Sequence, residues 1–227
     1  VKATTTYDLA RTLLETYLGS YSGGHVLDGL VERGHGRLID CALWYCDLRD
    51  STAMADSMSI EDYLEAINQY FDCTAGAVLD HGGEVLKFIG DAVMAIFPFE
   101  DATRPAVDMC RAAAMTAREA FSKANSVNAG RADKSLPPID FGVSLHVGQV
   151  MYGNVGTAQR LDFTVTGPAA NEATRLEGLC KALGTSVIAS SRFEEICPEE
   201  LISLGVHDAA GVEGGLAAFT LADFAPA

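Results

Sequence analysis

The spacing of hydrophobic and polar residues predicts alternating helices and strands in the first half of the chain. Apolar residues recur at helical intervals in YDLARTLLETYL (7–18), in the shorter run HVLDGLVER (25–33) and in the long stretch 60–78. Ser59 stands where the N-cap of that third helix belongs. The continuous apolar runs typical of buried strands are LIDCALWYC (38–46), GEVLKFI (83–89) and AVMAIF (92–97).

The second half of the chain continues this alternation. Residues 102–125 are predicted to be helical, and SVNAGRADKSLPP (126–138) has the composition of a surface loop. The segments that follow are IDFGVSLHV (139–147) and QVMYGNV (149–155) as a hairpin, DFTVTG (162–167) as a strand and NEATRLEGLCKAL (171–183) as a helix. The order β-α-β-β-α-β, with additional strands after it, predicts an α/β fold of the ferredoxin-like sandwich class.

The length and the net charge of the chain limit the kinds of function that it can have. A chain of 227 residues that is 48% hydrophobic is able to bury the core of one generous domain. Its 16 basic and 31 acidic residues give a formal net charge of −15, which argues against a nucleic-acid partner because such binding needs a basic face. A polyanionic ligand would have to be held by local groups or metal ions, since the overall field repels it.

The six cysteines are far apart along the chain and mostly lie within apolar runs. They form no CxxC pair and no Cys/His spacing for zinc, so we interpret them as small buried residues in a reducing, cytoplasmic compartment. No apolar run approaches the roughly 18 residues of a membrane span. Because the sequence lacks an initiator methionine, we expect a fragment of a longer protein, which leaves room for an upstream sensor or membrane domain.

Two aspartates stand at the ends of apolar runs. Asp47 directly follows the strand 38–46, and Asp91 occupies the Gly-Asp step between the two strands of a predicted hairpin. If the first strand pairs with that hairpin, strand ends about 4.8 Å apart would bring the carboxylates together. Two close carboxylates repel each other unless a cation neutralises them, and hard oxygen ligands suit Mg²⁺. Either residue alone is better explained by a cap or a turn, but together they favour a metal site.

The turn after Asp47 is a second candidate site. The residues LRDST (48–52) lead into a short helix, whose free backbone N–H groups form an anion site. An ordinary N-cap by Asp50 or Ser51 would explain the same residues. No GxxxxGK[ST] motif occurs, which excludes a P-loop, and GNVG (153–156) is too short for a dinucleotide fingerprint.

A third cluster lies on the predicted helix that begins near residue 171. Asn171 and Arg175 are four residues apart and therefore share a helix face. An amide and a guanidinium presented together suit a negative charge that develops on phosphate. Taken alone, these residues are better explained by a surface pair, or by a salt bridge from Arg175 to Glu172 or Glu177.

Four segments carry a resemblance to a known family. They are CDLRDST, LKFIGDAVMAIF, VSLHVGQVMYGNVG and FTVTGPAANEATRLE, and in this order and spacing they closely resemble the class III nucleotidyl cyclase catalytic domain. The resemblance covers about residues 37–222. It implies a catalytic domain at 37–227, preceded by a helical lead-in segment at 1–36.

The resemblance assigns metal-binding and triphosphate-binding roles to several residues. Asp47 and Asp91 match the two metal-binding aspartates of the family, and the carbonyl of Leu48 matches a further metal ligand. The backbone amides around Ser51 and Thr52 match the cradle of the nucleotide triphosphate. The implied metals are Mg²⁺ or Mn²⁺, two per site.

The remaining motifs match the residues that read the base and stabilise the transition state. Lys87 matches the lysine that reads adenine in adenylate cyclases, and Thr164 falls at the second purine-reading position, as in one bacterial branch. Asn171 and Arg175 match the pair that orients the ribose and stabilises the transition state. The family's active unit is a head-to-tail homodimer, in which one subunit supplies the aspartates and the other supplies these four residues.

The implied activity is that of an adenylate cyclase, which converts ATP to 3′,5′-cyclic AMP and pyrophosphate by in-line attack of the 3′-oxygen on the α-phosphorus. Two alternatives stay open. A guanylate or mixed-purine cyclase is one, because Thr164 is less diagnostic than aspartate; a low-activity nucleotide-binding dimerisation module is the other. His146, inside the strand SLHVG, is interpreted as a structural residue rather than a base.

The sequence departs from the family pattern at several charged positions. Gly142 stands where many members carry a cation that contacts the triphosphate, and Glu213 aligns with a lysine of similar function. A lost charged hydrogen bond typically costs about 1.5–3 kcal/mol, so weak ATP affinity or low basal activity is expected. Arg160 and Lys181 are candidates to compensate.

Overall fold

The computed structural model describes residues 2–27, 34, 36–100, 103–157, 159–198, 201–208 and 214–226. The helices within these ranges are α1 (Lys2–Leu18), α2 (Ser20–Leu27), α3 (Ser51–Ser57), α4 (Ile60–Asp80), α5 (Ala106–Asp133), α6 (Pro168–Glu177), α7 (Cys180–Leu183), α8 (Ser191–Glu194) and the 3-10 helix η2 (Ala222–Phe224). The strands are β1 (Gly36–Leu48), β2 (Glu84–Ile89), β3 (Ala92–Pro98), β4 (Phe141–Thr157), β5 (Arg160–Thr166), β6 (Val187–Ser190), β7 (Leu201–His207) and β8 (Leu216–Leu221).

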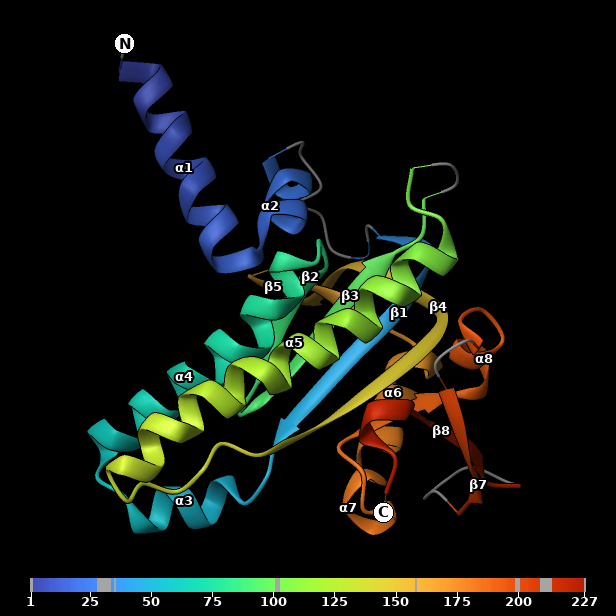
Figure 1. Ribbon diagram of the computed structural model, residues 1–227. Coiled ribbons are helices and arrows are strands. Elements are labelled where there is room, and N and C mark those ends of the chain that lie inside the picture. Colours follow the sequence, from blue (N-terminus) through green and yellow to red (C-terminus); the bar gives the residue numbers. More distant parts are fainter. Residues whose placement is uncertain are drawn as a thin grey trace.

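The strands of the described ranges form one mixed sheet (Figure 1). Its order is β2-β3-β1-β4-β6-β8-β7, and β5 pairs with the C-terminal part of β4. β1 lies antiparallel between β3 and β4, whereas β6 is parallel to β4. The first four strands together with α4 and α5 form the predicted β-α-β-β-α-β unit, so the ferredoxin-like α/β class with additional strands is confirmed.

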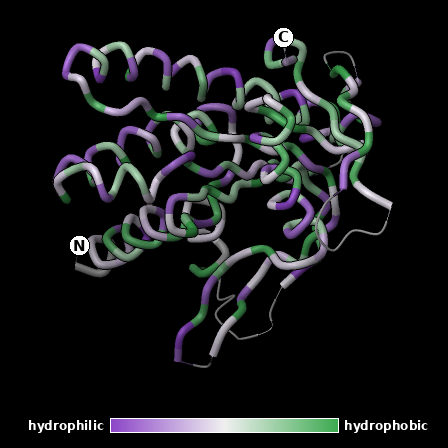
Figure 2. The backbone as a smooth tube through the Cα atoms, turned by 90° about the horizontal axis from the view of Figure 1, so that it is seen from below, coloured by the Kyte–Doolittle hydropathy of each residue, from purple (hydrophilic) through white to green (hydrophobic). Residues whose placement is uncertain are grey.

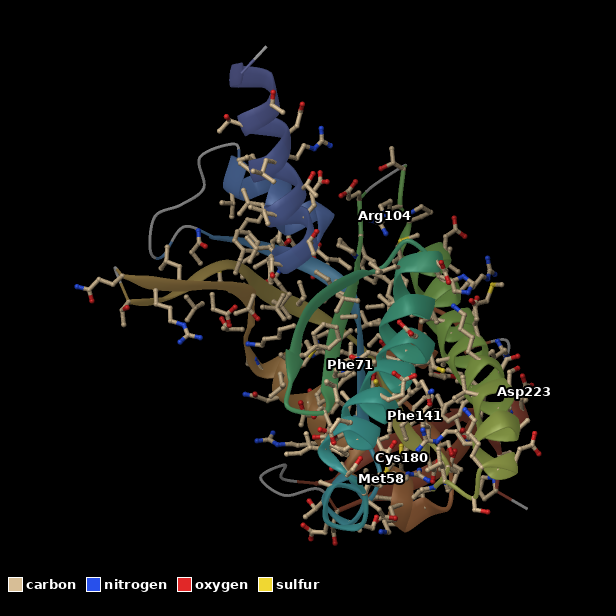
Figure 3. The ribbon with its side chains drawn as sticks, turned by 90° about the vertical axis from the view of Figure 1, so that its left-hand side faces the viewer. Met58, Phe71, Arg104, Phe141, Cys180 and Asp223 are labelled. Atoms are coloured by element: carbon tan, nitrogen blue, oxygen red, sulfur yellow. The ribbon has the colours of Figure 1, made fainter. Side chains whose placement is uncertain are left out.

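The long helices α4 and α5 pack side by side over one face of the sheet (Figure 1). Hydrophobic and hydrophilic residues alternate along them (Figure 2), as expected for helices that bury one face. Ser59 caps α4 as predicted, because its Oγ accepts a hydrogen bond from the backbone N–H of Asp62. Phe71 of α4 packs on Phe88 of β2, with ring centroids 4.2 Å apart, and Phe141 fixes the start of β4 beneath the helices (Figure 3).

The predicted turn at Gly148 is wrong. Residues 141–157 form the single strand β4, which pairs with β1 along the whole length of β1. Gly148 is required by the close approach of α6 from the other face, since a Cβ at this position would lie 2.5 Å from the Cβ of Ala169. The hairpin of this region is instead formed by β4 and β5.

The loop predicted from the composition of SVNAGRADKSLPP is mostly wrong, because α5 continues through more than half of it. Arg131 is only 3% exposed, and its Nε donates to the carbonyl oxygen of Pro137 at 2.7 Å. Asn128 exchanges two hydrogen bonds with the backbone of Ile139, at 2.7 and 2.8 Å. The polar residues that suggested a loop therefore tie the returning chain to the helix.

The helix predicted at 171–183 is two helices. It begins earlier than expected, at Pro168, which occupies the first turn of α6 where a missing N–H costs nothing. It ends at Glu177, before Gly178, a poor helix former, and the chain re-forms a helix as α7. The break leaves Glu177 at the C-terminal end of α6, facing the sheet.

The N-terminal helices attach to the sheet through a buried polar contact. The helix predicted at 7–18 is α1, which begins earlier, at Lys2, and projects away from the sheet (Figure 1); most of 25–33 lies outside the described residues. The backbone N–H and the hydroxyl of Ser22 donate to Oε1 of Glu84, which also accepts from the hydroxyl of Tyr152 at 2.8 Å. A division between lead-in and catalytic domain at residue 36 stays a prediction.

None of the helices in the described part of the chain combines the length and apolar character that crossing a membrane requires.

Candidate active site

The two aspartates are carried to one end of the sheet by adjacent strands. Asp47 is the penultimate residue of β1, and Asp91 lies in the turn that joins β2 to β3. Pairing of Cys46 with Val93 sets the register that places this turn beside the end of β1. Gly90 has a φ of +65°, a left-handed conformation that glycine adopts without strain, so it permits the tight turn that presents Asp91.

The carboxyl groups of Asp47 and Asp91 interact electrostatically. Partial burial raises the pKa of Asp47, the charge of Asp91 raises it further, and a hydrogen bond from the backbone of Leu48 opposes both effects. The described residues contain no group of three or more His, Cys, Asp or Glu arranged to hold a metal. A pair of repelling carboxylates beside a main-chain carbonyl nevertheless fits Mg²⁺ or Mn²⁺, because Mg²⁺ is commonly held by one or two carboxylates together with substrate phosphates.

The turn after β1 leads directly into α3, at the end of the sheet that holds the aspartates (Figure 1). Asp50 occupies the N-cap position with a left-handed φ of 54°, but its side chain makes no capping hydrogen bond. Ser51 and Thr52 are the first residues of the helix, where backbone N–H groups have no helical acceptor. Lys181 approaches the same turn, with its Nζ 3.5 Å from Oδ1 of Asp50.

Glu177 is a further acidic residue at this end of the sheet. The sequence analysis did not identify that it lies close to Asp47. Its carboxyl group lies against Gly142, which pairs with Asp47 across β1 and β4. Burial and the charge of Asp47 raise the pKa of Glu177 to about 7, while Arg49 lowers it. One signal was present in the sequence: Glu177 follows Ala173 by four residues and so shares the buried face of α6.

Lys87 and Thr164 lie on the neighbouring strands β2 and β5. Nζ of Lys87 on β2 is 3.4 Å from Oδ2 of Asp162 on β5. Thr164 follows on the same strand and is 3% exposed, and its hydroxyl has no hydrogen-bond partner among the described residues. Sequence reasoning had not singled out Asp162.

Asn171 and Arg175 occupy the outer face of α6. Both are exposed, whereas Ala173 and Leu176 between and beside them are buried against the sheet. In the described part of the chain neither forms a hydrogen bond or an ion pair, so the salt bridges considered for Arg175 are not formed. Neither forms a hydrogen bond or an ion pair with Asp47. The candidate residues are therefore treated as two sets. The first set is Asp47, Leu48, Ser51, Thr52 and Asp91, and the second set is Lys87, Thr164, Asn171 and Arg175.

The remaining titratable candidates belong to the core. All six cysteines are buried and free, as interpreted from the sequence. His146 is fully buried, and burial with the charge of Arg192 lowers its pKa to about 4, so the imidazole is neutral at physiological pH. Its Nε2 lies 3.8 Å from Oε2 of Glu172. This supports a structural role for His146.

Glu213 lies outside the described residues, and Arg160 is exposed in the β4–β5 hairpin, where it lines a cavity together with Lys87.

Solved structures with the same fold include several cyclases. A bacterial light-regulated adenylyl cyclase matches with a TM-score of 0.82 at 23% identity, covering 99% of this chain and 64% of that one. The adenylyl cyclase CyaB from P. aeruginosa matches with a TM-score of 0.74 at 20% identity, covering 82% of this chain and 95% of that one. At these identities the similarity shows the fold.

Curated relatives are more similar in sequence. A protein named adenylate cyclase from Anabaena cylindrica is 33% identical over 172 residues, and adenylate cyclase 1 from Rhizobium meliloti (strain 1021) is 34% identical over 178 residues. Each alignment covers 74% of this chain, but the chain spans only 33% and 26% of those proteins. The family described as the adenylate and guanylate cyclase catalytic domain matches residues 35–217. This match covers most of the chain, so the protein belongs to the adenylate and guanylate cyclase catalytic domain family.

Proposed function

We propose that the chain is an adenylate cyclase, which forms 3′,5′-cyclic AMP and pyrophosphate from ATP. The observation that carries the proposal is the convergence of Asp47 and Asp91 at the end of the sheet where α3 begins, where burial first and the charge of Asp91 second raise the pKa of Asp47. The names of the relatives from Anabaena cylindrica and Rhizobium meliloti support ATP as the substrate.

Asp47 and Asp91, together with the carbonyl of Leu48, would hold two Mg²⁺ or Mn²⁺ ions. When bound, such ions supply the positive charge that lowers the pKa of the ATP 3′-hydroxyl and neutralises the phosphates. The cation would also stabilise the ionised form of both carboxylates, because it removes the repulsion between them. Backbone amides at Ser51 and Thr52 bind the triphosphate at the start of α3.

The second set of residues acts on the base, the ribose and the transition state. Lys87 donates to the purine, and the buried Thr164 hydroxyl gains the partner it lacks in the described chain. Asn171 orients the ribose by hydrogen bonding, and the Arg175 guanidinium stabilises the charge that develops on the α-phosphate. No side-chain nucleophile is required, because the substrate's own 3′-oxygen attacks phosphorus in line with the leaving pyrophosphate.

The two sets meet in a head-to-tail homodimer with two shared active sites. Within one chain, Asn171 and Arg175 point away from the sheet and form no hydrogen bond or ion pair with described residues. A second copy with two-fold symmetry would bring these side chains to the aspartates of its partner, and the reverse contact would form at the second site.

The affinity for ATP is expected to be modest. Gly142 supplies no cation, and the neighbouring Glu177 carboxyl adds negative potential near the triphosphate. Lys181 is the better placed of the two candidates to compensate, since its ammonium already lies beside the turn at Asp50.

A turnover assay tests the proposal. The purified chain at high concentration is incubated with Mn²⁺ and either ATP or GTP, and cyclic nucleotide is measured by liquid chromatography. We expect cyclic AMP in excess of cyclic GMP, and none with an Asp47→Ala variant. A clear preference for GTP would indicate a guanylate cyclase instead. Formation of neither product, with nucleotide still bound, would indicate a non-catalytic dimerisation module.

A further inference from the structure

The peptide bond that joins Leu48 to Arg49 is held by β4 at the point where β1 ends. Leu48 is the last residue of β1 and pairs with Phe141. The backbone N–H of Arg49 then donates to the carbonyl oxygen of Asp140 at 2.8 Å. The described chain contains no cis peptide bond, and a trans peptide is planar with its C=O opposite its N–H. The Leu48 carbonyl is therefore directed away from β4, to the side of β1 on which β3 and the turn at Asp91 lie.

The side chain of Arg49 fastens this turn to a well-anchored part of the core. Its Nη2 donates to the carbonyl oxygen of Thr185 at 2.9 Å, and its Nη1 lies 3.3 Å from Oδ2 of Asp140. Thr185 is 3% exposed, and its hydroxyl is hydrogen-bonded to the hydroxyl of Thr220 in β8 and to the carbonyl oxygen of Phe224. Arg49 thus ties the end of β1 to the segment that precedes β6.

The next residue, Asp50, has a backbone conformation that its surroundings must impose. Its φ of 54° and ψ of 27° are left-handed, and a residue other than glycine keeps this conformation only where neighbouring contacts enforce it. The Asp50 side chain makes no capping hydrogen bond, and its ion pair with Lys181 is exposed on both sides. The turn is held on the helix side by the N–H of Met54, which donates to the Asp50 carbonyl at 3.0 Å, and on the strand side by Arg49.

We propose that Arg49 is a positioning residue for the metal site, an inference that rests on the metal binding of the proposed cyclase function. Arg49 does not itself bind the ion. Its backbone N–H directs the carbonyl of Leu48, and its guanidinium holds the left-handed turn that follows, so this carbonyl is oriented before an ion binds. An ion that meets ligands whose positions are already fixed is bound more tightly.

Charge alone predicts the opposite effect of removing the Arg49 side chain. A guanidinium near the site repels a cation, so its loss by itself should strengthen metal binding. Loss of its hydrogen bonds to Thr185 and Asp140 should instead free the turn and weaken metal binding. A role only in stability would lower the free energy of unfolding without changing the affinity of the folded protein. The direction of the change in Mn²⁺ affinity therefore distinguishes the three roles.

The test measures binding of Mn²⁺ alone to variants of the full chain, from the electron paramagnetic resonance signal of the free ion. Arg49→Ala should bind Mn²⁺ about tenfold more weakly than the wild type, as is typical when a group that orients a metal ligand is removed. Arg49→Lys should keep part of the affinity, because an ammonium replaces one hydrogen bond of the guanidinium but not its fork. Adding Asp50→Gly to Arg49→Ala should recover part of the loss, since glycine adopts the left-handed turn without strain.

Arg118→Ala is the matched control, because it removes the same charge from the chain. The Arg118 side chain is 28% exposed, close to the 22% of Arg49, and its Nε donates to Oδ2 of Asp223 at 2.7 Å. This variant should leave the Mn²⁺ affinity unchanged. If Arg49→Ala does not fold, as judged by thermal unfolding, Arg49→Met takes its place, because methionine keeps the length of the side chain without its donors.

The outcomes separate this inference from the proposed function. A folded Arg49→Ala variant that binds Mn²⁺ as tightly as the wild type, or more tightly, overturns the inference even if the wild type forms cyclic AMP. A wild type that binds Mn²⁺ but forms no cyclic nucleotide contradicts the function, yet weaker Mn²⁺ binding by Arg49→Ala would still support the inference. A wild type that binds no Mn²⁺ overturns the inference as well.

Discussion

The carboxyl group of Glu177 occupies the space that a side chain at position 142 would need. A Cβ on Gly142 would overlap Oε1 of Glu177 and would lie 3.3 Å from the Cβ of Cys180. The backbone at Gly142 does not have a left-handed φ, so other residues could adopt it. A side chain at position 142 would therefore have to displace the end of the Glu177 side chain.

Gly142→Ala is expected to destabilise the protein by less than about 1 kcal/mol, because the methyl group displaces only the flexible end of the Glu177 side chain. In a Glu177→Ala background the same substitution should be neutral or stabilising, since alanine is favoured over glycine in a strand by roughly 0.5–1 kcal/mol. Urea denaturation of the wild-type, both single variants and the double variant measures this coupling. Additive effects of the two substitutions would show that the carboxyl group does not fill the space.

The stability of the metal-free protein should depend on the ionisation of Glu177. Its pKa of about 7 in the folded chain exceeds the ordinary value of 4.5, so the folded state holds the proton more tightly than the unfolded state. The resulting stabilisation is fully present below pH 4.5 and is lost as the pH rises through 7. Relative to Glu177→Gln, the wild-type free energy of unfolding should fall between about pH 5 and pH 8.

Measuring the difference between wild type and Glu177→Gln in EDTA cancels most other titrations. Asp47 is the main exception, because its charge contributes to the raised pKa of Glu177. A difference in unfolding free energy that is constant across this pH range would contradict the prediction.

The sequence predicted the strands that carry Asp47 and Asp91 because a buried strand and a glycine turn are local signals. The apolar runs, the Gly-Asp step and the capping Ser59 each reflect forces between residues close in the chain. Order along the chain then suggested the ferredoxin-like unit, whose strand pairing brings the two aspartates to one end of the sheet.

Contacts distant in sequence could not be predicted in the same way. Gly148 suggested a turn, but the packing of α6 on β4 requires it. Arg131 suggested a loop, yet it is buried by contacts that the returning chain provides. Glu177 contacts Gly142, which is 35 positions away in the chain, and Asp162 pairs with Lys87, which is 75 positions away. Because these partners are distant in sequence, no local pattern singled out Glu177 or Asp162.

Asp91→Asn should preserve or raise the stability of the metal-free protein while it abolishes metal binding and cyclase activity. The substitution removes the charge that raises the pKa of Asp47, so the metal-free variant should unfold at the same or a higher temperature than the wild type. Addition of Mn²⁺ should stabilise the wild type and not the variant. Cyclic AMP formation should fall at least about a hundredfold. Equal stabilisation of both proteins by Mn²⁺ would show that Asp91 does not bind the metal.

Shared active sites predict that two inactive variants restore each other. Asp47→Ala removes a metal ligand and Asn171→Ala removes a residue from the other set, so each homodimer should be inactive. In an equal mixture half of the dimers are mixed, and each mixed dimer has one intact site, which gives about a quarter of the wild-type activity. Asp47→Ala mixed with Asp91→Ala is the matched control and should stay inactive, because both substitutions affect the same set. If mixed dimers of Asp47→Ala and Asn171→Ala form, as native mass spectrometry detects, but produce no cyclic AMP, each chain must build its site from its own residues.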